Sequence, residues 1–276
     1  MPLFAGIDVG VQSVKAVLFD GEKIIGSNVL VTEEEADRAA CRVYQDLLSE
    51  LQLGPEAVER LFVTGWGAAD VSFADGRSSE QVCAAKGARF LLPSVRTVLD
   101  MGAEGCRVMR LDPDGTLENF VNNSKCASGT GSFIELGAVY LQVGIDEMST
   151  LSLSADGVAD VSSMCAVFAE SVIISHIHSG EPIERIAAGI HQSAAIRVSE
   201  LLGRIGMIED VMFVGGTARN KGLVKMLEEM NRVALRIPED PRIVTALGAA
   251  IQAATKKPLR RKTSTLPDRM NPGEAG

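Results

Sequence analysis

Two apolar runs near the start of the chain predict a β-hairpin. Residues 3–10 form one run and residues 15–20 form a second, and the short polar segment between them is typical of a turn. Asp20-Gly21 then supplies a further turn signal after the second run. The chain is therefore expected to open with a tight hairpin that has Asp8 beside its turn.

The same pattern returns in residues 98–112. A shift of 92 residues superposes four pairs: Asp8 on Asp100, Gly10 on Gly102, Lys15 on Arg107 and Asp20 on Asp112. Asp-x-Gly between two strands also recurs by chance, but the matched basic residue and the matched hairpin turn favour an internal duplication.

The rest of the pattern predicts helices between short buried strands. An amphipathic helix is expected at 33–53, a buried strand at 60–64 and a helix at 78–92 that ends before Pro93. After the second hairpin we expect helices that begin near Ser128, near Cys165 and at Pro182. Residues 211–216 are expected to form a strand followed by a glycine turn, and helices are expected at 221–235 and 242–255.

This succession of elements predicts an α/β protein of two duplicated domains, each led by one hairpin, with a cleft between them. We place the domains at residues 1–95 and 96–257. Residues 258–276 are polar and broken by prolines, which is typical of a disordered tail.

Composition and charge narrow the class of protein. The chain has 276 residues, of which 46 % are hydrophobic, and 36 acidic against 27 basic side chains give a formal charge of −9. This balance argues against nucleic-acid binding as the main role. No apolar run is long enough to span a bilayer and the first residues lack a signal-peptide pattern, so we expect a cytoplasmic protein that does not enter membranes.

The two hairpin turns are expected to place one carboxylate each at a strand end. Backbone amides near Gly10 and Gly102 can bind phosphate oxygens, and Asp8 and Asp100 can hold Mg²⁺ through water. Lys15 can neutralise a phosphate oxygen. For either aspartate alone a structural role in its turn is equally well supported, and it is the pair that favours a nucleotide.

Two further glycine stretches extend this interpretation. Gly129-Thr130-Gly131 lies at an expected helix start, where N–H donors and the positive end of the helix dipole favour anions. Gly215-Gly216 follows a buried strand, as the hairpin turns do. Each stretch alone is weak evidence for a phosphate site.

Cys126 and Cys165 each precede an expected helix, where the thiolate form is favoured. From the residues alone, burial in the core is the better supported role for either cysteine. Two thiolates are half of the four that an iron–sulfur cluster uses, so a cluster would require two subunits. Trp66 could line the cleft or a partner surface, but packing in the core is the better supported expectation. Cys41 and Cys83 are expected to pack in helices, and Cys106 is expected on a strand that faces the core or the cleft.

Six stretches of this sequence carry a resemblance to a known family. They are GIDVG at 6–10 with Lys15, KCASGTGSF at 125–133, MCAVFAESVIISHIHSGEP at 164–182, IAAGIHQSAAIRV at 186–198, FVGGTARNKGLV at 213–224 and DPRIVTALGAA at 240–250. Together they resemble the acetate kinase, sugar kinase, Hsp70 and actin superfamily. Within it they resemble the iron–sulfur branch, which contains the ATPase subunits of benzoyl-CoA reductase and the activators of 2-hydroxyacyl-CoA dehydratases.

The resemblance implies two ribonuclease H-like domains that bind ATP and Mg²⁺, with catalytic roles for Asp8, Asp100 and Glu104. It also implies a [4Fe–4S] cluster held by Cys126 and Cys165 of two subunits. An electron from ferredoxin or flavodoxin would pass through this cluster, driven by ATP, to an acyl-CoA reductase or dehydratase. The implied nucleotide contacts are Gly10, Ser13, Lys15, Gly102, Gly129, Thr130, Gly131, Gly215 and Gly216.

Three segments depart from the family pattern. Val11-Gln12 stands where the first turn usually has a hydroxyl, and the second turn reads DMGAEG at 100–105 in place of DIGGQD. Arg242 replaces the glutamine of Asp-Pro-Gln. These departures argue against efficient hydrolysis in this subunit. They resemble the divergent second ATPase-type subunit of benzoyl-CoA reductase, which pairs with an orthodox sibling subunit, more than a homodimeric dehydratase activator.

Other functions stay open at this point. The chain could be a homodimeric activator, a scaffold subunit that binds ATP without hydrolysing it, a small-molecule kinase of the same superfamily, or a thiol enzyme that uses Cys126. Iron content separates the first two from the last two.

Overall fold

The protein, in a computed structural model, is described for residues 2–31, 34–123, 129–161 and 166–255. Its contacts divide the chain into two compact units, Met1–Cys83 with Thr245–Gly276, and Ala84–Val244. The boundary at 95–96, expected from the sequence as the start of the second duplicated half, stays a prediction. Among the described helices, none is long and apolar enough to cross a membrane.

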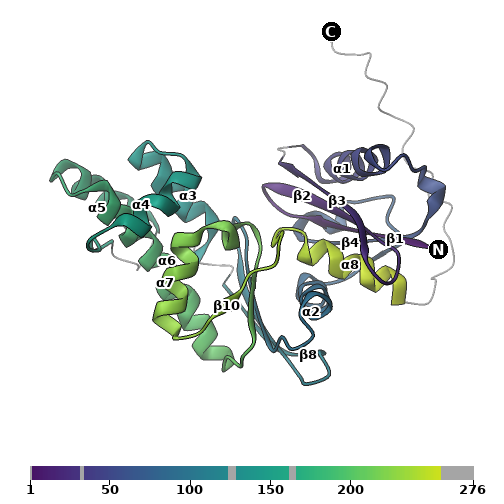
Figure 1. Ribbon diagram of the computed structural model, residues 1–276. Coiled ribbons are helices and arrows are strands. Elements are labelled where there is room, and N and C mark those ends of the chain that lie inside the picture. The colour runs from purple at the N-terminus through teal and green to yellow at the C-terminus, as the bar shows by residue number, and fades with distance from the viewer. Residues whose placement is uncertain (1, 32–33, 124–128, 162–165, 256–276) are drawn as a thin grey trace, which may run out of the picture. The chain divides into compact units, whose positions relative to one another are not determined.

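The first unit is built on a mixed five-stranded sheet in the order β3-β2-β1-β4-β5 (Figure 1). Its central strand β1 pairs antiparallel with β2 and parallel with β4. The strands are β1 (Leu3–Val9), β2 (Ser13–Phe19), β3 (Ile24–Val31), β4 (Val58–Thr64) and β5 (Gly76–Arg77). Two short 3₁₀ turns flank β4: η1 (Pro55–Ala57) and η2 (Trp66–Ala69).

A helix covers each face of this sheet. In α1 (Ala36–Glu50) the buried side chains recur every three or four residues and pack on Ile7 and Leu18. On the other face α8 (Val244–Thr255) lies so close to β1 that a Cβ at Gly6 would be 2.1 Å from the Ala246 carbonyl oxygen. Glycine is therefore required at this point of the central strand.

The second unit contains a sheet of the same kind in the order β10-β9-β6-β7-β8. Its strands are β6 (Thr97–Met101), β7 (Cys106–Leu111), β8 (Leu117–Asn123), β9 (Val211–Val214) and β10 (Leu235–Arg236). The part of α2 (Glu80–Leu91) that belongs to this unit packs on one face through Ala84 and Ala88.

The long helix α6 (Ile183–Ile205) packs on β7 and β8 and forms the centre of the helical part of this unit. Around it lie α3 (Gly131–Leu141), α4 (Ile145–Ser154), α5 (Ala166–His178) and α7 (Lys221–Asn231), with the 3₁₀ turn η4 (Gly216–Arg219) after β9. Figure 1 shows α3, α4 and α5 as one group beside α6.

The two sheets confirm the duplication predicted from the sequence. In the first, Asp8 pairs in register with Lys15 on β2 and with Thr64 on β4. In the second, Asp100 pairs with Arg107 on β7 and with Val214 on β9. The α/β class and the pairing order of the hairpin strands are thus as expected.

Some elements differ from the sequence prediction. The strands β3 and β8 and the helix α4 were not expected. All positions of β3 and β8 are half-buried or exposed, so their apolar residues show no clear period. The helix α4 contains four Ser or Thr residues, which are weak helix formers. The helix expected at 221–235 ends at Asn231, because Arg232 adopts the left-handed conformation with φ 53°.

Cys41, Cys83 and Cys106 are buried, as expected. Burial raises the pKa of the Cys41 and Cys106 thiols, so both stay protonated at neutral pH. The expectation that Trp66 packs in the core is wrong, because this side chain is 79 % exposed. It begins η2 directly after Gly65, and in this short turn Gly67 and Ala68 take the buried positions.

His191 is a fully buried polar side chain in the core of the second unit. Its Nε2 lies 2.9 Å from Asn220 Nδ2. The Oδ1 of Asn220 accepts the backbone N–H of Leu223, so the amide nitrogen donates to a neutral imidazole. Burial lowers the pKa of His191 from 6.5 to about 4.

Replacing His191 by Gln should make the free energy of unfolding depend less steeply on pH in acid. The unfolded chain binds a proton at His191 below about pH 6.5, whereas the folded protein does so only near pH 4. The contribution of neutral His191 to the free energy of unfolding is therefore fully present above pH 6.5 and is lost as the pH falls towards 4, by roughly 3 kcal/mol. Urea unfolding across this range measures the effect. The exposed His178→Gln serves as the control, and a His191→Gln slope equal to wild type would contradict the prediction.

Candidate nucleotide site

In the first unit, the turn between β1 and β2 holds a carboxylate and an ammonium together. Asp8 lies near the carboxyl end of β1, is 9 % exposed, and has its Oδ2 3.6 Å from Lys15 Nζ. The Ser13 carbonyl accepts two hydrogen bonds, at 3.1 Å from Gly10 N and at 3.1 Å from Lys15 Nζ. The predicted residues Asp8, Gly10, Ser13 and Lys15 are thus brought together, but the Gly10 amide closes the turn instead of facing a ligand.

The strand β4 supplies the third side of this turn through Thr64 and Gly65. Gly65 has φ +97°, a conformation that side chains rarely adopt, and its Cβ would lie 2.7 Å from Asp8 Oδ1. Glycine lets the backbone pass directly beside the carboxylate. Gly65 was not predicted to belong to the site, although a buried strand followed by Thr-Gly was a usable signal.

The second unit repeats this geometry with a guanidinium. Arg107 Nη1 donates to Asp100 Oδ2 at 3.0 Å, and Asp100 is 6 % exposed. Gly102 N donates to Gly105 O at 2.8 Å and closes the turn. The backbone of Gly215, which has φ +91°, lies directly beside the Asp100 carboxylate, as that of Gly65 lies beside Asp8. A Cβ on Gly215 would be 2.9 Å from Asp100 Oδ1.

The start of α3 is bound to this second turn. Gly131 N donates to Gly102 O and Ser132 N to Ala103 O, each at 2.9 Å. A Cβ on Gly131 would lie 3.0 Å from both Gly102 O and Thr217 Cγ2. The Gly131 amide, expected to bind phosphate, therefore ties the helix to the turn instead.

The other residues predicted to bind the nucleotide, Thr130, Gly216 and Gly129, differ in their surroundings. Thr130 is buried at the N-cap of α3, and Gly216 is exposed with open space beside its Cα. Gly129 faces Asn123 and Arg197, since a Cβ on it would be 2.7 Å from Asn123 Nδ2 and 3.0 Å from Arg197 Cβ. Thr217, which was not among the predicted residues, donates from Oγ1 to the Met101 carbonyl at 2.7 Å and so fixes η4 beside the turn.

Glu104 was assigned a catalytic role, and the structure places it on the exposed turn between β6 and β7. The hydrogen bonds and ion pairs of the described residues do not involve its carboxylate. A role for Glu104 beside the phosphates remains a prediction.

Cys126 and Cys165, the predicted cluster ligands, lie outside the described residues. Across the part of the chain that is described, no group of three or more His, Cys, Asp or Glu side chains is placed to hold a metal ion. Asp8 and Asp100 offer one carboxylate per turn. This suits Mg²⁺, which keeps several waters and takes its other ligands from substrate phosphates.

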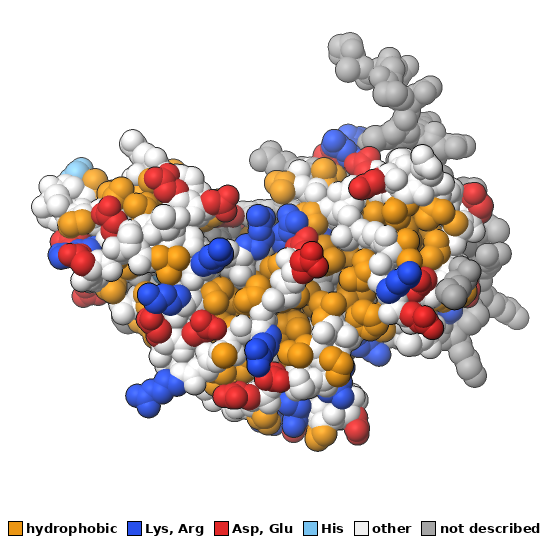
Figure 2. All heavy atoms as spheres, viewed as in Figure 1, with side chains coloured by type: hydrophobic (Ala, Val, Ile, Leu, Met, Phe, Trp, Pro, Cys, Tyr) orange, Lys and Arg blue, Asp and Glu red, His pale blue; other side chains and the backbone are white. Residues whose placement is uncertain are grey.

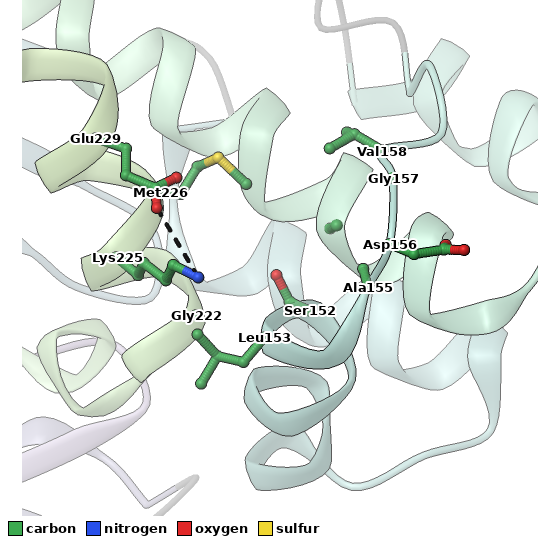
Figure 3. A pocket seen from close by; sticks show the side chains of 11 residues that line it. Ser152, Leu153, Ala155, Asp156, Gly157, Val158, Gly222, Lys225, Met226 and Glu229 are labelled. Carbon is green, nitrogen blue, oxygen red and sulfur yellow. Dashed lines mark ion pairs between the residues drawn. The ribbon is translucent and has the colours of Figure 1, made fainter.

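A pocket of about 260 Å³ lies between α4, α6 and α7 and contains none of the predicted residues (Figure 3). Its side chains include Leu153 and Met226, with Lys225 and Glu229 paired at 3.8 Å. Both charges of this pair are more than half exposed, so the pair contributes little. On the face seen in Figure 2, acidic and basic side chains are interspersed with apolar ones.

These duplicated sheets, each with a carboxylate turn and a glycine beside it, define an ATPase-type fold shared by actin, Hsp70 and ROK sugar kinases. A ROK hexokinase from Thermus thermophilus has this fold, with a TM-score of 0.52 at 14 % identity. The sequence pattern of the BadF/BadG/BcrA/BcrD ATPase family matches residues 5–253, and the chain belongs to that family.

Relatives of two kinds are similar over nearly the whole chain. The 2-hydroxyisocaproyl-CoA dehydratase activator of Clostridioides difficile is 38 % identical over 249 residues, which cover 90 % of this chain and 93 % of that protein. A benzoyl-CoA reductase subunit of Thauera aromatica is 37 % identical over 266 residues, covering 92 % and 94 %. The solved structure of the activator with bound ADPNP has a TM-score of 0.86 over 91 % of this chain and 94 % of that chain.

Proposed function

We propose that this chain is an ATP-driven electron-transfer subunit. It would pass a low-potential electron through a [4Fe–4S] cluster shared between two subunits to an enzyme that acts on an acyl-CoA. The observation that carries the proposal is the pair of bonds from Gly131 N and Ser132 N to the second turn. They connect a candidate phosphate turn directly to the helix that follows Cys126 in sequence.

The two turns would bind the nucleotide. Asp8 and Asp100 would hold the hydrated Mg²⁺ of ATP, which polarises the phosphoryl group and neutralises its charge. Lys15 and Arg107 lie within 4 Å of these carboxylates and supply positive charge at the same strand ends. The close passage of Gly65 and Gly215 keeps the space beside each carboxylate free of side chains.

A change from bound ATP to bound ADP would be transmitted to the cluster by a movement of α3. A shift of Gly102 or Ala103 on hydrolysis would move the first turn of α3, because two backbone bonds join them. In α5, which follows Cys165, Glu170 accepts a hydrogen bond from Tyr140 of α3, and this bond raises the pKa of Tyr140. The two helices that follow the cysteines are thus connected to each other.

The partner enzyme is proposed on narrower grounds. The departures at Ala103, Glu104 and Gly105 favour the divergent ATPase-type subunit of benzoyl-CoA reductase, which pairs with a sibling subunit. The second candidate is a homodimeric activator of a 2-hydroxyacyl-CoA dehydratase, and identities of 37 % and 38 % to the two kinds of relative do not separate them. Ferredoxin or flavodoxin would supply the electron in either case.

Anaerobic iron analysis and EPR test the proposal. The protein would be purified alone and together with an orthodox sibling subunit, with and without ATP. A four-iron centre only in the mixed pair supports the reductase subunit, and one in the protein alone supports the activator. Absence of iron from both preparations would remove the electron-transfer function and leave a kinase-like protein.

A further inference from the structure

Thr64 is a fully buried side chain at the end of β4, and its hydroxyl has no hydrogen-bond partner among the described residues. An unpaired buried hydroxyl costs about 1–3 kcal/mol, and such groups in native proteins usually meet a water or a ligand.

The position of Thr64 in the sheet indicates what its hydroxyl serves. Lys15, Asp8 and Thr64 are register partners on three adjacent strands, β2, β1 and β4, so their side chains project from the same face in one row. Gly65, the next residue, is the glycine whose Cα faces Asp8 Oδ1. The unpaired hydroxyl therefore neighbours the carboxylate of the candidate site.

The second unit supplies an internal comparison. The equivalent row there is Arg107, Asp100 and Val214, and Gly215 follows Val214 as Gly65 follows Thr64. Valine has nearly the shape of threonine without its hydroxyl. The second half therefore has an apolar side chain at this position of the same strand arrangement, and we expect the first half to fold without the hydroxyl of Thr64.

We propose that Thr64 is a positioning residue of the nucleotide site, and that its hydroxyl holds an ordered water which Asp8 also binds. With a Mg²⁺-nucleotide bound, Thr64 and Asp8 would hold one of the waters that Mg²⁺ keeps. The inference rests on the proposed ATPase function. It also makes the two halves unequal, because only the first has the hydroxyl.

Thr64→Val tests the proposal with the side chain that the second half already uses. We expect a roughly tenfold fall in the rate of ATP hydrolysis, as for one lost hydrogen bond, and weaker calorimetric binding of Mg²⁺-ADP. The urea midpoint should stay the same or rise, since an unpaired buried hydroxyl is removed. Thr64→Ser should retain most activity, and Thr116→Val, at an exposed turn, should change neither property.

The results for Thr64→Val and for the wild type separate the role of Thr64 from the proposed function. A lower urea midpoint for Thr64→Val would mean that the hydroxyl has a structural partner and would overturn the proposal, as would wild-type hydrolysis and nucleotide affinity in that variant. If the wild-type protein itself binds no Mg²⁺-nucleotide, the proposed function fails, and the role of Thr64 fails with it.

Discussion

Replacing Asp8 by Asn will lower the rate of ATP hydrolysis by roughly 10²–10³-fold. The substitution keeps the shape of the side chain but removes the charge that pairs with Lys15 Nζ at 3.6 Å and that would hold the hydrated Mg²⁺. The turn itself should survive, because Gly10 N still donates to Ser13 O. Steady-state phosphate release, measured with saturating Mg²⁺ and ATP, gives the effect.

Two controls make this result informative. Asp20→Asn lies in an exposed turn, where its carboxylate accepts backbone N–H groups of Glu22 and Lys23, and it should leave hydrolysis unchanged. Asp100→Asn tests the other half directly. A fall like that of Asp8→Asn would mean that both turns work, whereas near-normal turnover would identify a divergent second turn. Hydrolysis unaffected by Asp8→Asn would contradict the assigned role of this carboxylate.

Replacing either Cys126 or Cys165 by Ser should abolish the four-iron centre completely. A cluster shared by two subunits takes two thiolates from each, so each substitution in a homodimer removes two of four ligands. In a heterodimer with a sibling subunit, one ligand of four is lost. Iron analysis and the EPR spectrum after anaerobic reconstitution measure the loss.

Cys41→Ser is the matched control for both substitutions. Its thiol is buried in α1, and burial raises its pKa, which disfavours the thiolate that a metal requires. Iron content should therefore equal that of the wild type. Four irons retained in Cys126→Ser and in Cys165→Ser would show that other side chains hold the metal.

The sequence predicts best where partners are close along the chain. Asp8 and Lys15, or Asp100 and Arg107, are joined by one tight hairpin, so the strand pattern and the turn residues place them opposite each other. The duplicated hairpins were found for this reason. Their shared glycine turns followed from the same local signals.

Contacts between distant segments could not be predicted in this way. The hydrogen bond from Gly131 N to Gly102 O, and the close approach of Gly65 to Asp8, exist only because separate strands and helices pack together. The bond that uses the Gly131 amide therefore appears only in the structure. Thr64 was missed because a threonine in a buried strand gives no signal until its missing hydrogen bond is visible.

Trp66 follows Thr64-Gly65, is 79 % exposed, and is the only tryptophan of the chain. All of the indole fluorescence of the protein therefore comes from one point, two residues beyond the row that contains Asp8. An event that changes the polarity around η2 will appear in this single emission, and the wild-type chain carries its own optical probe without any added label.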